Sequence, residues 1–393
     1  MARRRPANAG ATTGWRSRSF RRRSQEDRTM RLDKKGDTAV LVLKNEEIEG
    51  LVSMPEVVEV MEEAFRELGE GIAMNAPRAR LRLPWKEPGG QYYFNNIMGL
   101  VPGMKSMGLR IDSSFSKEIE TEGHRRRVYP GDFVGLIFLF DMDTCELRAI
   151  MDDHVISTIR VGATSGVATK CLARAGARIL GLLGSGEQAR TQLTAVLSVR
   201  PVERVKVYSP TKENRERFAR EMSARCGVEV IPVASAEEAV RGSDIVTAAT
   251  NTVDPVVEGR WLEEGTHVNS IVGGDRYLLR RELDDEVIRR AGLIVVGSRE
   301  QIFLDRQAEF ADRLERGLVR AEDLHELGEL VTGRCRGRKH ETEITVFKNN
   351  TGMGIQFAAT ARKVYEKARE KRVGTELSLD LFMTRRGDKA YSP

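Results

Sequence analysis

Between Arg178 and Gly297 the chain repeats one unit, a short apolar segment followed by a helical pattern, and this alternation restricts its fold more than any other feature. Strands that alternate with helices pair in parallel, because each helix returns the chain along one face of the sheet. We therefore expect an α/β fold built on a doubly wound parallel sheet. The six expected strands are 178–183, 204–209, 228–233, 244–250, 267–272 and 292–297, with helical stretches such as 187–199 and 212–225 between most of them.

The turn after the first of these strands has a glycine spacing that is typical of dinucleotide binding. Gly184 permits a tight turn, Gly186 lets the backbone approach a pyrophosphate, and Ala189 lets the following helix pack closely on the strand. The helix would then direct its first amides at the phosphates. A tight turn without a ligand is the alternative. We predict a Rossmann-type NAD(P) site that includes Gly184, Ser185, Gly186, Glu187, Gln188 and Ala189.

The end of the second strand indicates which cofactor is preferred. An NAD site usually has an acid there to bind the ribose 2′-hydroxyl, and this chain has Ser209, Thr211 and Lys212 instead. Hydroxyl donors and the cations Lys212 and Arg215 suit a 2′-phosphate, so we expect NADP(H) to be preferred over NAD(H). The alternative is that Lys212 and Arg215 only face solvent.

The remainder of the chain predicts a second, discontinuous domain of α+β type. A strand at 39–43 and an amphipathic helix at 55–68 precede alternating segments that favour a mostly antiparallel sheet. The strand 344–347 and the helix 354–372 are placed back on this domain, because the parallel sheet is complete without them. The expected organisation is a basic extension at 1–30, the first part of the substrate-binding and dimerisation domain at 31–155, a Rossmann domain at 156–320, and a returning segment at 321–393.

Composition excludes several classes of protein. Residues 1–30 hold nine arginines against two acids, while the whole chain has a net charge of +6, so the remainder is close to neutral. We expect this segment to be disordered, with a nucleic-acid-binding arm and an over-extended start before Met30 as alternatives. Four widely spaced cysteines and scattered histidines predict no metal site and fit a reducing cytoplasm. No apolar run is long enough to span a membrane.

Three segments around the glycine turn carry a family resemblance: 156–165, 259–265, and 267–275 with 281–284. With them the chain resembles the ornithine cyclodeaminase/mu-crystallin family from about residue 40 to 375. The resemblance implies a homodimer, in which the discontinuous domain forms both the interface and the substrate pocket beside the Rossmann domain. The family includes cyclodeaminases, alanine dehydrogenases, ketimine reductases and thyroid-hormone-binding crystallins, so membership leaves the reaction open.

The resemblance also implies roles for particular residues. Arg160 stands where the family binds the substrate carboxylate, and Arg78 and Arg110 stand at two further cationic positions, the second often Lys in the family. Asp275 matches the active-site aspartate and could transfer a proton, with a helix N-cap as the alternative. Arg160 could instead form a structural salt bridge, and Arg80 and Arg82 compete with Arg78. The residues expected beside the cofactor are Thr164 and Asn269.

Two regions depart from the family pattern. The segment 347–357 has Phe where the pattern leads us to expect Asp, which leaves the substrate open. Asn95 and Asn96 offer amides where a cyclodeaminase would hold a distal amine with an acid, so ornithine is not the expected substrate. The charged insertion with Glu118, Glu120, Glu122 and residues 125–127 is expected to be a solvated loop, with a lid over the pocket as the alternative.

These observations lead to three hypotheses of function. The first is an NAD(P)H-dependent oxidoreductase for C–N bonds of small amino or imino acids, of ketimine reductase or amino-acid dehydrogenase type. The second is a cyclodeaminase, an ammonia lyase that uses the cofactor without net turnover. The third is a non-catalytic NADPH-binding protein resembling the crystallins. The presence of Arg160 and Asp275 favours an enzyme.

Overall fold

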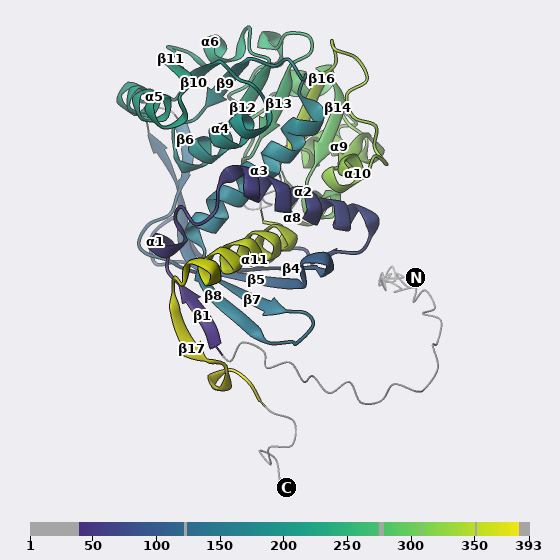
Figure 1. The fold of residues 1–393 in the computed structure, drawn as a ribbon. Coiled ribbons are helices and arrows are strands. Elements are labelled where there is room, and N and C mark those ends of the chain that lie inside the picture. The colour runs from purple at the N-terminus through teal and green to yellow at the C-terminus, as the bar shows by residue number, and fades with distance from the viewer. Residues whose placement is uncertain (1–38, 122–123, 275–278, 308, 350–351, 385–393) are drawn as a thin grey trace, which may run out of the picture. The chain divides into compact units, whose positions relative to one another are not determined.

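The computed structural model of the protein describes residues 39–121, 124–274, 279–307, 309–349 and 352–384. This part of the chain contains a parallel sheet and a mostly antiparallel sheet, and helix α3 (His154–Leu172) carries the chain from one to the other. Figure 1 shows helices α2, α3 and α11 between the two sheets. The basic extension 1–30 lies outside the described residues, so its expected disorder stays a prediction.

The parallel sheet has eight strands in the order β11-β10-β9-β12-β13-β16-β14-β15, and every pair in it is parallel. The six strands expected from the sequence are all present, so the doubly wound α/β fold is confirmed. The strands are β9 (Ile179–Leu183), β10 (Arg204–Tyr208), β11 (Glu229–Pro232), β12 (Ile245–Ala248), β13 (His267–Ser270), β14 (Ala291–Val296), β15 (Leu324–Glu326) and β16 (Ile344–Lys348). Their helices are α4 (Glu187–Val199), α5 (Lys212–Cys226), α6 (Ala236–Val240), α7 (Asp285–Arg290), α8 (Arg299–Asp305), α9 (Ala311–Glu315) and α10 (Leu327–Val331).

The placement of strand β16 corrects the expectation that the parallel sheet is complete without it. β16 pairs with β13 on one side and with β14 on the other, and all five of its residues are buried. A strand buried on both faces belongs inside a parallel sheet, not on a half-exposed antiparallel one. The short strand β15 also joins this sheet, so the segment 321–393 contributes to both sheets instead of returning only to the first domain. The other domain boundaries stay predictions.

The second sheet has nine strands along the order β17-β1-β8-β7-β5-β4-β2, with β3 paired to β4 and β6 paired to β5. All its pairs are antiparallel except that of β1 with β8. The strands are β1 (Ala39–Leu43), β2 (Met74–Asn75), β3 (Ala79–Pro84), β4 (Gly90–Val101), β5 (Ser106–Thr121), β6 (His124–Val128), β7 (Val134–Asp141), β8 (Leu147–Asp152) and β17 (Thr375–Ser378).

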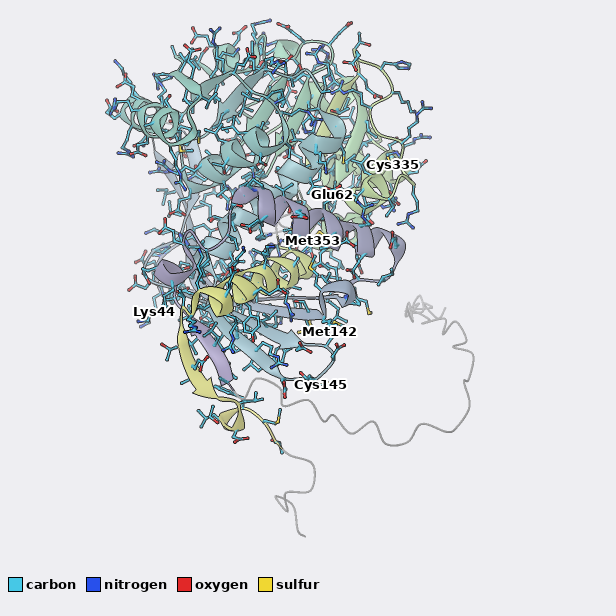
Figure 2. All side chains as sticks on the ribbon, in the orientation of Figure 1. Lys44, Glu62, Met142, Cys145, Cys335 and Met353 are labelled. Carbon is cyan, nitrogen blue, oxygen red and sulfur yellow. The ribbon has the colours of Figure 1, made fainter. Side chains whose placement is uncertain are left out.

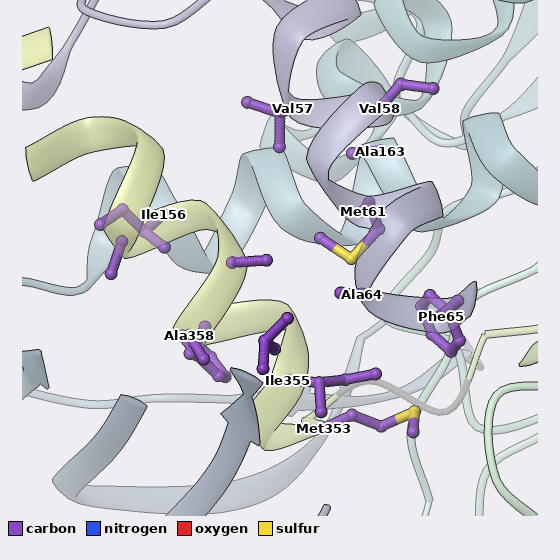
Figure 3. Packing of buried hydrophobic residues seen from close by; sticks show 14 of the residues in the cluster. Val57, Val58, Met61, Ala64, Phe65, Ile156, Ala163, Met353, Ile355 and Ala358 are labelled. Carbon is purple, nitrogen blue, oxygen red and sulfur yellow. The ribbon is translucent and has the colours of Figure 1, made fainter. Parts of the chain in front are cut away.

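One face of this sheet is covered by helices. Helix α11 (Gly354–Lys371) packs directly on it, and α2 (Met54–Glu70) packs on α11, while the short α1 (Asn45–Ile48) contacts α3. Figure 3 shows Met61 and Phe65 of α2 near Ile355 and Ala358 of α11, all fully buried. The sheet admits α11 closely because Gly99 has no side chain; a Cβ there would lie 2.4 Å from the backbone nitrogen of Ile355.

The four cysteines are free thiols in this fold. Figure 2 shows Cys145 and Cys335 far apart, beside different sheets. Among the described residues no group of three or more His, Cys, Asp or Glu side chains could hold a metal ion. None of the described helices is long and apolar enough to cross a membrane.

Candidate functional site

The glycine turn has the geometry that a dinucleotide requires. Gly184 follows β9 with φ of +113°, and a Cβ at this position would lie 2.1 Å from the carbonyl oxygen of Ala249. Gly186 is the N-cap of α4, and the space where its Cβ would stand is open. Ala189 is fully buried where α4 packs on the sheet. An open helix N-terminus with a bare backbone suits a pyrophosphate, so these residues fit the cofactor.

The hydroxyls expected to select the cofactor lie beside this turn. The Ser185 hydroxyl donates to the Ser209 hydroxyl at 3.0 Å, which joins the turn to the end of β10. Thr211 is the exposed N-cap residue of α5, and the Lys212 side chain is mostly exposed, with its amine 3.8 Å from Glu216. Arg215 donates to the Ser209 carbonyl at 2.9 Å. Ser209 is thus joined to the glycine turn and Arg215 to the backbone of the same segment, while the cation Lys212 extends outward.

A cavity of about 510 Å³ opens where the glycine turn meets the antiparallel sheet. Glu187 and Gln188 line it from the cofactor side, while β4 and β5 supply alternate residues from the other. Arginines dominate the charged groups of its wall: Arg78, Arg80, Arg110, Arg127, Arg160 and Arg280. Such a surplus of guanidinium groups indicates an anionic ligand.

Arg160 lies on α3 and is only 6% exposed. Its Nη1 donates to Oε1 of Gln356, and its guanidinium carbon lies 4.5 Å from the ring centroid of Phe357. Both neighbours are neutral, and no carboxylate among the described residues is within salt-bridge distance of Arg160. Burial, together with the charges of Arg110 and Arg78, lowers the pKa of Arg160 to about 9. The site therefore holds a destabilised cation that an incoming carboxylate would stabilise.

The other two expected cationic residues also line the cavity but are already neutralised. Arg110 donates to Asp153 from Nε and Nη2 at 2.6 and 2.5 Å, and its Nη1 lies 3.3 Å from Asp112. Arg78 contacts Asp305 of α8 at 2.5 Å. Each of these two arginines is thus paired with a carboxylate, whereas no carboxylate among the described residues pairs with Arg160.

Arg80 accompanies Arg78 instead of competing with it. Arg80 also lines the cavity, and its Nη1 lies 3.3 Å from the same Asp305. Arg82 does not line the cavity and donates to Gln91 at 3.3 Å. Since Asp305 belongs to α8, which follows a strand of the parallel sheet, this carboxylate holds two cavity arginines of the antiparallel sheet in place.

The sequence missed an acid of the cavity wall. Asp112 accepts hydrogen bonds from Asn95 at 3.0 Å and from Ser114 at 2.8 Å, in addition to its ion pair with Arg110. Asn95 lines the cavity as expected for an amide of the site, but Asn96 does not. Every second residue of a strand shares a face. Asp112 and Ser114 alternate along one strand with the expected site residue Arg110, so the sequence could have indicated Asp112 as a residue of the site.

Two residues expected beside the cofactor have interior side chains. Thr164 is fully buried, and its hydroxyl donates to the Arg160 carbonyl and accepts from Gln356 at 2.8 Å each. The amide of Asn269 donates to Thr169 at 2.9 Å and is also fully buried. Neither side chain lines the cavity. Their expected place beside the cofactor therefore stays a prediction; within the protein, Thr164 supports Gln356, which holds Arg160.

Asp275 lies outside the described residues, so its place in the site stays a prediction. Gly273, two residues before it, does line the cavity. The approach to this segment is fixed by Glu282, which the sequence analysis did not single out. This buried carboxylate accepts from the backbone nitrogens of Thr250, Ile271 and Val272 at 2.8 to 2.9 Å. Glu282 thereby ties together the chain segments that leave β12 and β13.

The charged insertion is a hairpin, so the expectation of a solvated loop was wrong. Glu118 and Glu120 of β5 pair with Arg127 and Arg125 of β6, and Glu122 lies outside the described residues. Cross-strand pairing of opposite charges stabilises such a hairpin. Arg125 also contacts Asp254 at 2.9 Å, and Arg127 enters the cavity wall.

Comparison with known proteins agrees with this architecture. The model of the ornithine cyclodeaminase/mu-crystallin family matches residues 38–372. A Δ1-pyrroline-2-carboxylate reductase from Bacillus cereus is 31% identical, over 86% of this chain and 99% of the relative. An alanine dehydrogenase from Archaeoglobus fulgidus is 34% identical, over 86% and 98%.

A solved structure agrees equally well. The Δ1-pyrroline-2-carboxylate reductase of Thermococcus litoralis, in complex with NADH and L-proline, has a TM-score of 0.76 and 35% identity, and the match covers 86% of this chain and all of that one. The resemblance inferred from the sequence motifs is therefore confirmed. The chain belongs to the ornithine cyclodeaminase/mu-crystallin family.

Proposed function

We propose that this chain is an NAD(P)H-dependent oxidoreductase that acts on the C–N bond of small amino or imino acids. The observation that carries the proposal is Arg160, a buried cation without a carboxylate partner among the described residues, in a cavity that the cofactor turn also lines. Relatives with the names pyrroline-2-carboxylate reductase, alanine dehydrogenase and ketimine reductase support it.

Each group of the site has a role in this reaction. Arg160 binds the substrate carboxylate, since a planar guanidinium can donate two hydrogen bonds to it. Gln356 and the ring of Phe357 fix the plane of that guanidinium. The nicotinamide cofactor, when bound, supplies or accepts the hydride. Asp275 gives a proton to the substrate nitrogen or removes one from it, and Glu282 holds the chain that leads to Asp275.

The cyclodeaminase alternative needs an acid that can hold a distal ammonium. Asp112 is an acid of the cavity wall, and it already accepts from Asn95 and Ser114 and pairs with Arg110. A carboxylate with these partners has little capacity left for a substrate amine. This arrangement favours the oxidoreductase over an enzyme that deaminates ornithine.

We also propose that NADP(H) is the preferred cofactor. Ser209 bonds to Ser185 of the glycine turn, Thr211 and Lys212 begin α5 shortly after Ser209, and Lys212 can pair with a 2′-phosphate. Titrations should give tighter binding of NADPH than of NADH, and Lys212→Ala should weaken NADPH alone. Equal affinities would refute this preference.

We infer in addition that the chain forms a homodimer and works in the cytoplasm. A relative's structure is described as an alanine dehydrogenase dimer. The face of the nine-stranded sheet opposite the cavity supports this, because it presents the half-exposed row Met98, Leu109, Phe138 and Ile150. Four free thiols fit a reducing compartment.

The test is incubation of the purified chain with NADPH and a panel of cyclic imino acids, and of 2-oxo acids with ammonia or methylamine. Net loss of the near-ultraviolet absorbance of the reduced cofactor supports the oxidoreductase. Ammonia release from ornithine or lysine without net cofactor oxidation would instead establish a cyclodeaminase. Cofactor binding without either reaction would indicate a binding protein.

A further inference from the structure

A second buried cation of the cavity has no role in the reaction described so far. Arg280 lies between β13 and α7 and is 7% exposed. Its Nε donates to the carbonyl of Thr252 at 3.0 Å and its Nη1 to that of Gly273 at 3.4 Å. In the part of the chain that the structure describes, no carboxylate is within salt-bridge distance of it. Burial lowers the pKa of Arg280, as it does for Arg160.

Arg127 provides a second positive charge in the cavity wall, and its charge acts on Arg280. Its guanidinium carbon lies 5.0 Å from the ring centroid of Tyr93 and 5.1 Å from that of Tyr129, and its Nη2 donates to Ser116 at 3.1 Å. Stacking between two rings holds a guanidinium in a fixed plane. The cavity thus contains a rigid, preorganised cationic group that belongs to the β5–β6 hairpin.

This group is separated from Arg160 along the cavity. Arg160 and Arg110 both lie over Phe357, at 4.5 and 5.8 Å, and so mark one end. Arg127 stacks on Tyr93 of β4, which pairs with Ser114 of β5. Ser114 lies four residues along β5 from Arg110. Four residues of a strand span about 13 Å. The arginine side chains occupy part of this distance. The space left between their guanidinium groups suits a substrate with a short carbon chain.

We propose that Arg280 and Arg127 bind a distal carboxylate, so that the substrate is an amino or imino dicarboxylic acid. A buried guanidinium that faced an apolar substrate chain would lose its hydration without gaining a partner, which is unfavourable. A second carboxylate supplies that partner. This inference rests on the proposed function, because it names the substrate class of the same site.

The test compares acids with their isosteric amides as substrates of the full chain with saturating NADP⁺. We expect kcat/KM for L-glutamate to exceed that for L-glutamine, and that for L-aspartate to exceed that for L-asparagine, in at least one pair by about tenfold or more. L-2-aminoadipate extends the series in chain length. Arg280→Met should abolish the preference for the acid.

Arg281→Met is the matched control. It removes the same charge one residue away, but Arg281 pairs with Asp312 at 2.8 Å and does not line the cavity. This variant should keep the preference. Equal kcat/KM for acid and amide in the unmodified chain would refute the second carboxylate site. It would not contradict the proposed oxidoreductase activity.

Binding separates the remaining outcomes. Calorimetry of the NADPH complex should show that glutarate binds more tightly than butyrate, and that Arg280→Met removes the difference. If no amino acid is oxidised, the proposed function fails, and this measurement alone decides on the anion site. If Arg280→Met weakens NADPH as much as glutarate, Arg280 serves the cofactor and the proposal is overturned.

Discussion

Arg160 shows how a single residue can indicate a ligand. The sequence predicted a carboxylate-binding arginine at this position, with a structural salt bridge as the alternative. In the structure its neighbours Gln356 and Phe357 are neutral, so the salt-bridge alternative is not supported among the described residues. A buried cation whose direct contacts are neutral and whose charged neighbours include two further arginines is unfavourable unless an anion completes the site.

Replacement of Arg160 should therefore affect the substrate and not the cofactor. Arg160→Met removes a charge-assisted contact worth about 1.5–3 kcal/mol, so substrate affinity should fall by about ten- to a hundredfold. Steady-state kinetics gives the substrate effect, and fluorescence titration should show unchanged NADPH binding. Arg160→Lys keeps the charge but not the planar guanidinium, so its substrate affinity should lie between that of the unmodified chain and that of Arg160→Met. An unchanged KM in both variants would remove Arg160 from the binding site.

Asp275 should affect the chemical step instead. Asp275→Asn keeps the shape of the side chain but cannot exchange a proton, so kcat should fall by roughly 10²–10⁴ if general acid–base catalysis is its role. Rapid-mixing measurements would separate this step from binding. A variant that unfolds while its folded fraction stays fully active would show that Asp275 is a helix cap.

At the scale of elements, local features were predictable and long-range pairing was not. The turn at Gly184 and Gly186 follows from its own residues, because a positive φ and an open helix N-terminus are local properties. The place of β16 is set by β13 and β14, which are distant from it in the sequence. Arg280 was missed for the same reason, since its significance depends on neighbours in space.

One buried side chain links several of these elements. His267 of β13 is fully buried, with Nδ1 2.9 Å from the hydroxyl of Thr345 on β16 and Nε2 3.2 Å from Oδ1 of Asn269. Burial, with the charge of Arg338 second, lowers the pKa of His267 to about 3. The folded protein therefore holds this imidazole neutral across the usual range of pH.

His267 should make the fold sensitive to acid. The unfolded chain protonates this imidazole below about pH 6.5, and the folded chain does so only near pH 3. Between these values the unfolded state binds more protons, so the free energy of unfolding should fall as the pH drops from about 6.5 toward 3. His267→Gln should flatten the slope of Tm against pH between about 6.5 and 4.5, although it destabilises the fold.

The matched control is His325→Gln. The His325 side chain is 40% exposed, so its replacement should leave the slope unchanged. Calorimetric Tm values measured at several pH values provide the comparison. If the slope is the same for His267→Gln as for the unmodified chain, another group causes the acid sensitivity.

At the scale of the whole molecule, α11 covers one face of the nine-stranded sheet, and on the other face Leu379 and Met383 cover only part of the apolar surface. Helix α11 packs at Gly99 and Gly108, on the same face as the cavity residue Ile97. Residues of opposite parity point to the other face, where register aligns Met98 with Leu109. The same row continues across β7 and β8 through Phe138 and Ile150. Such a half-exposed apolar face is typical of a subunit interface.

A charge in this row should therefore separate the subunits. Met98 is 39% exposed in the single chain, so Met98→Glu should leave the fold intact while it places a carboxylate in the contact between two copies. Sedimentation velocity should give a dimer for the unmodified chain and a monomer for the variant at micromolar concentration. Ile72→Glu, at a position that is 51% exposed and outside this row, should remain dimeric. A dimeric Met98→Glu variant would place the interface elsewhere, and a monomeric unmodified chain would refute the dimer itself.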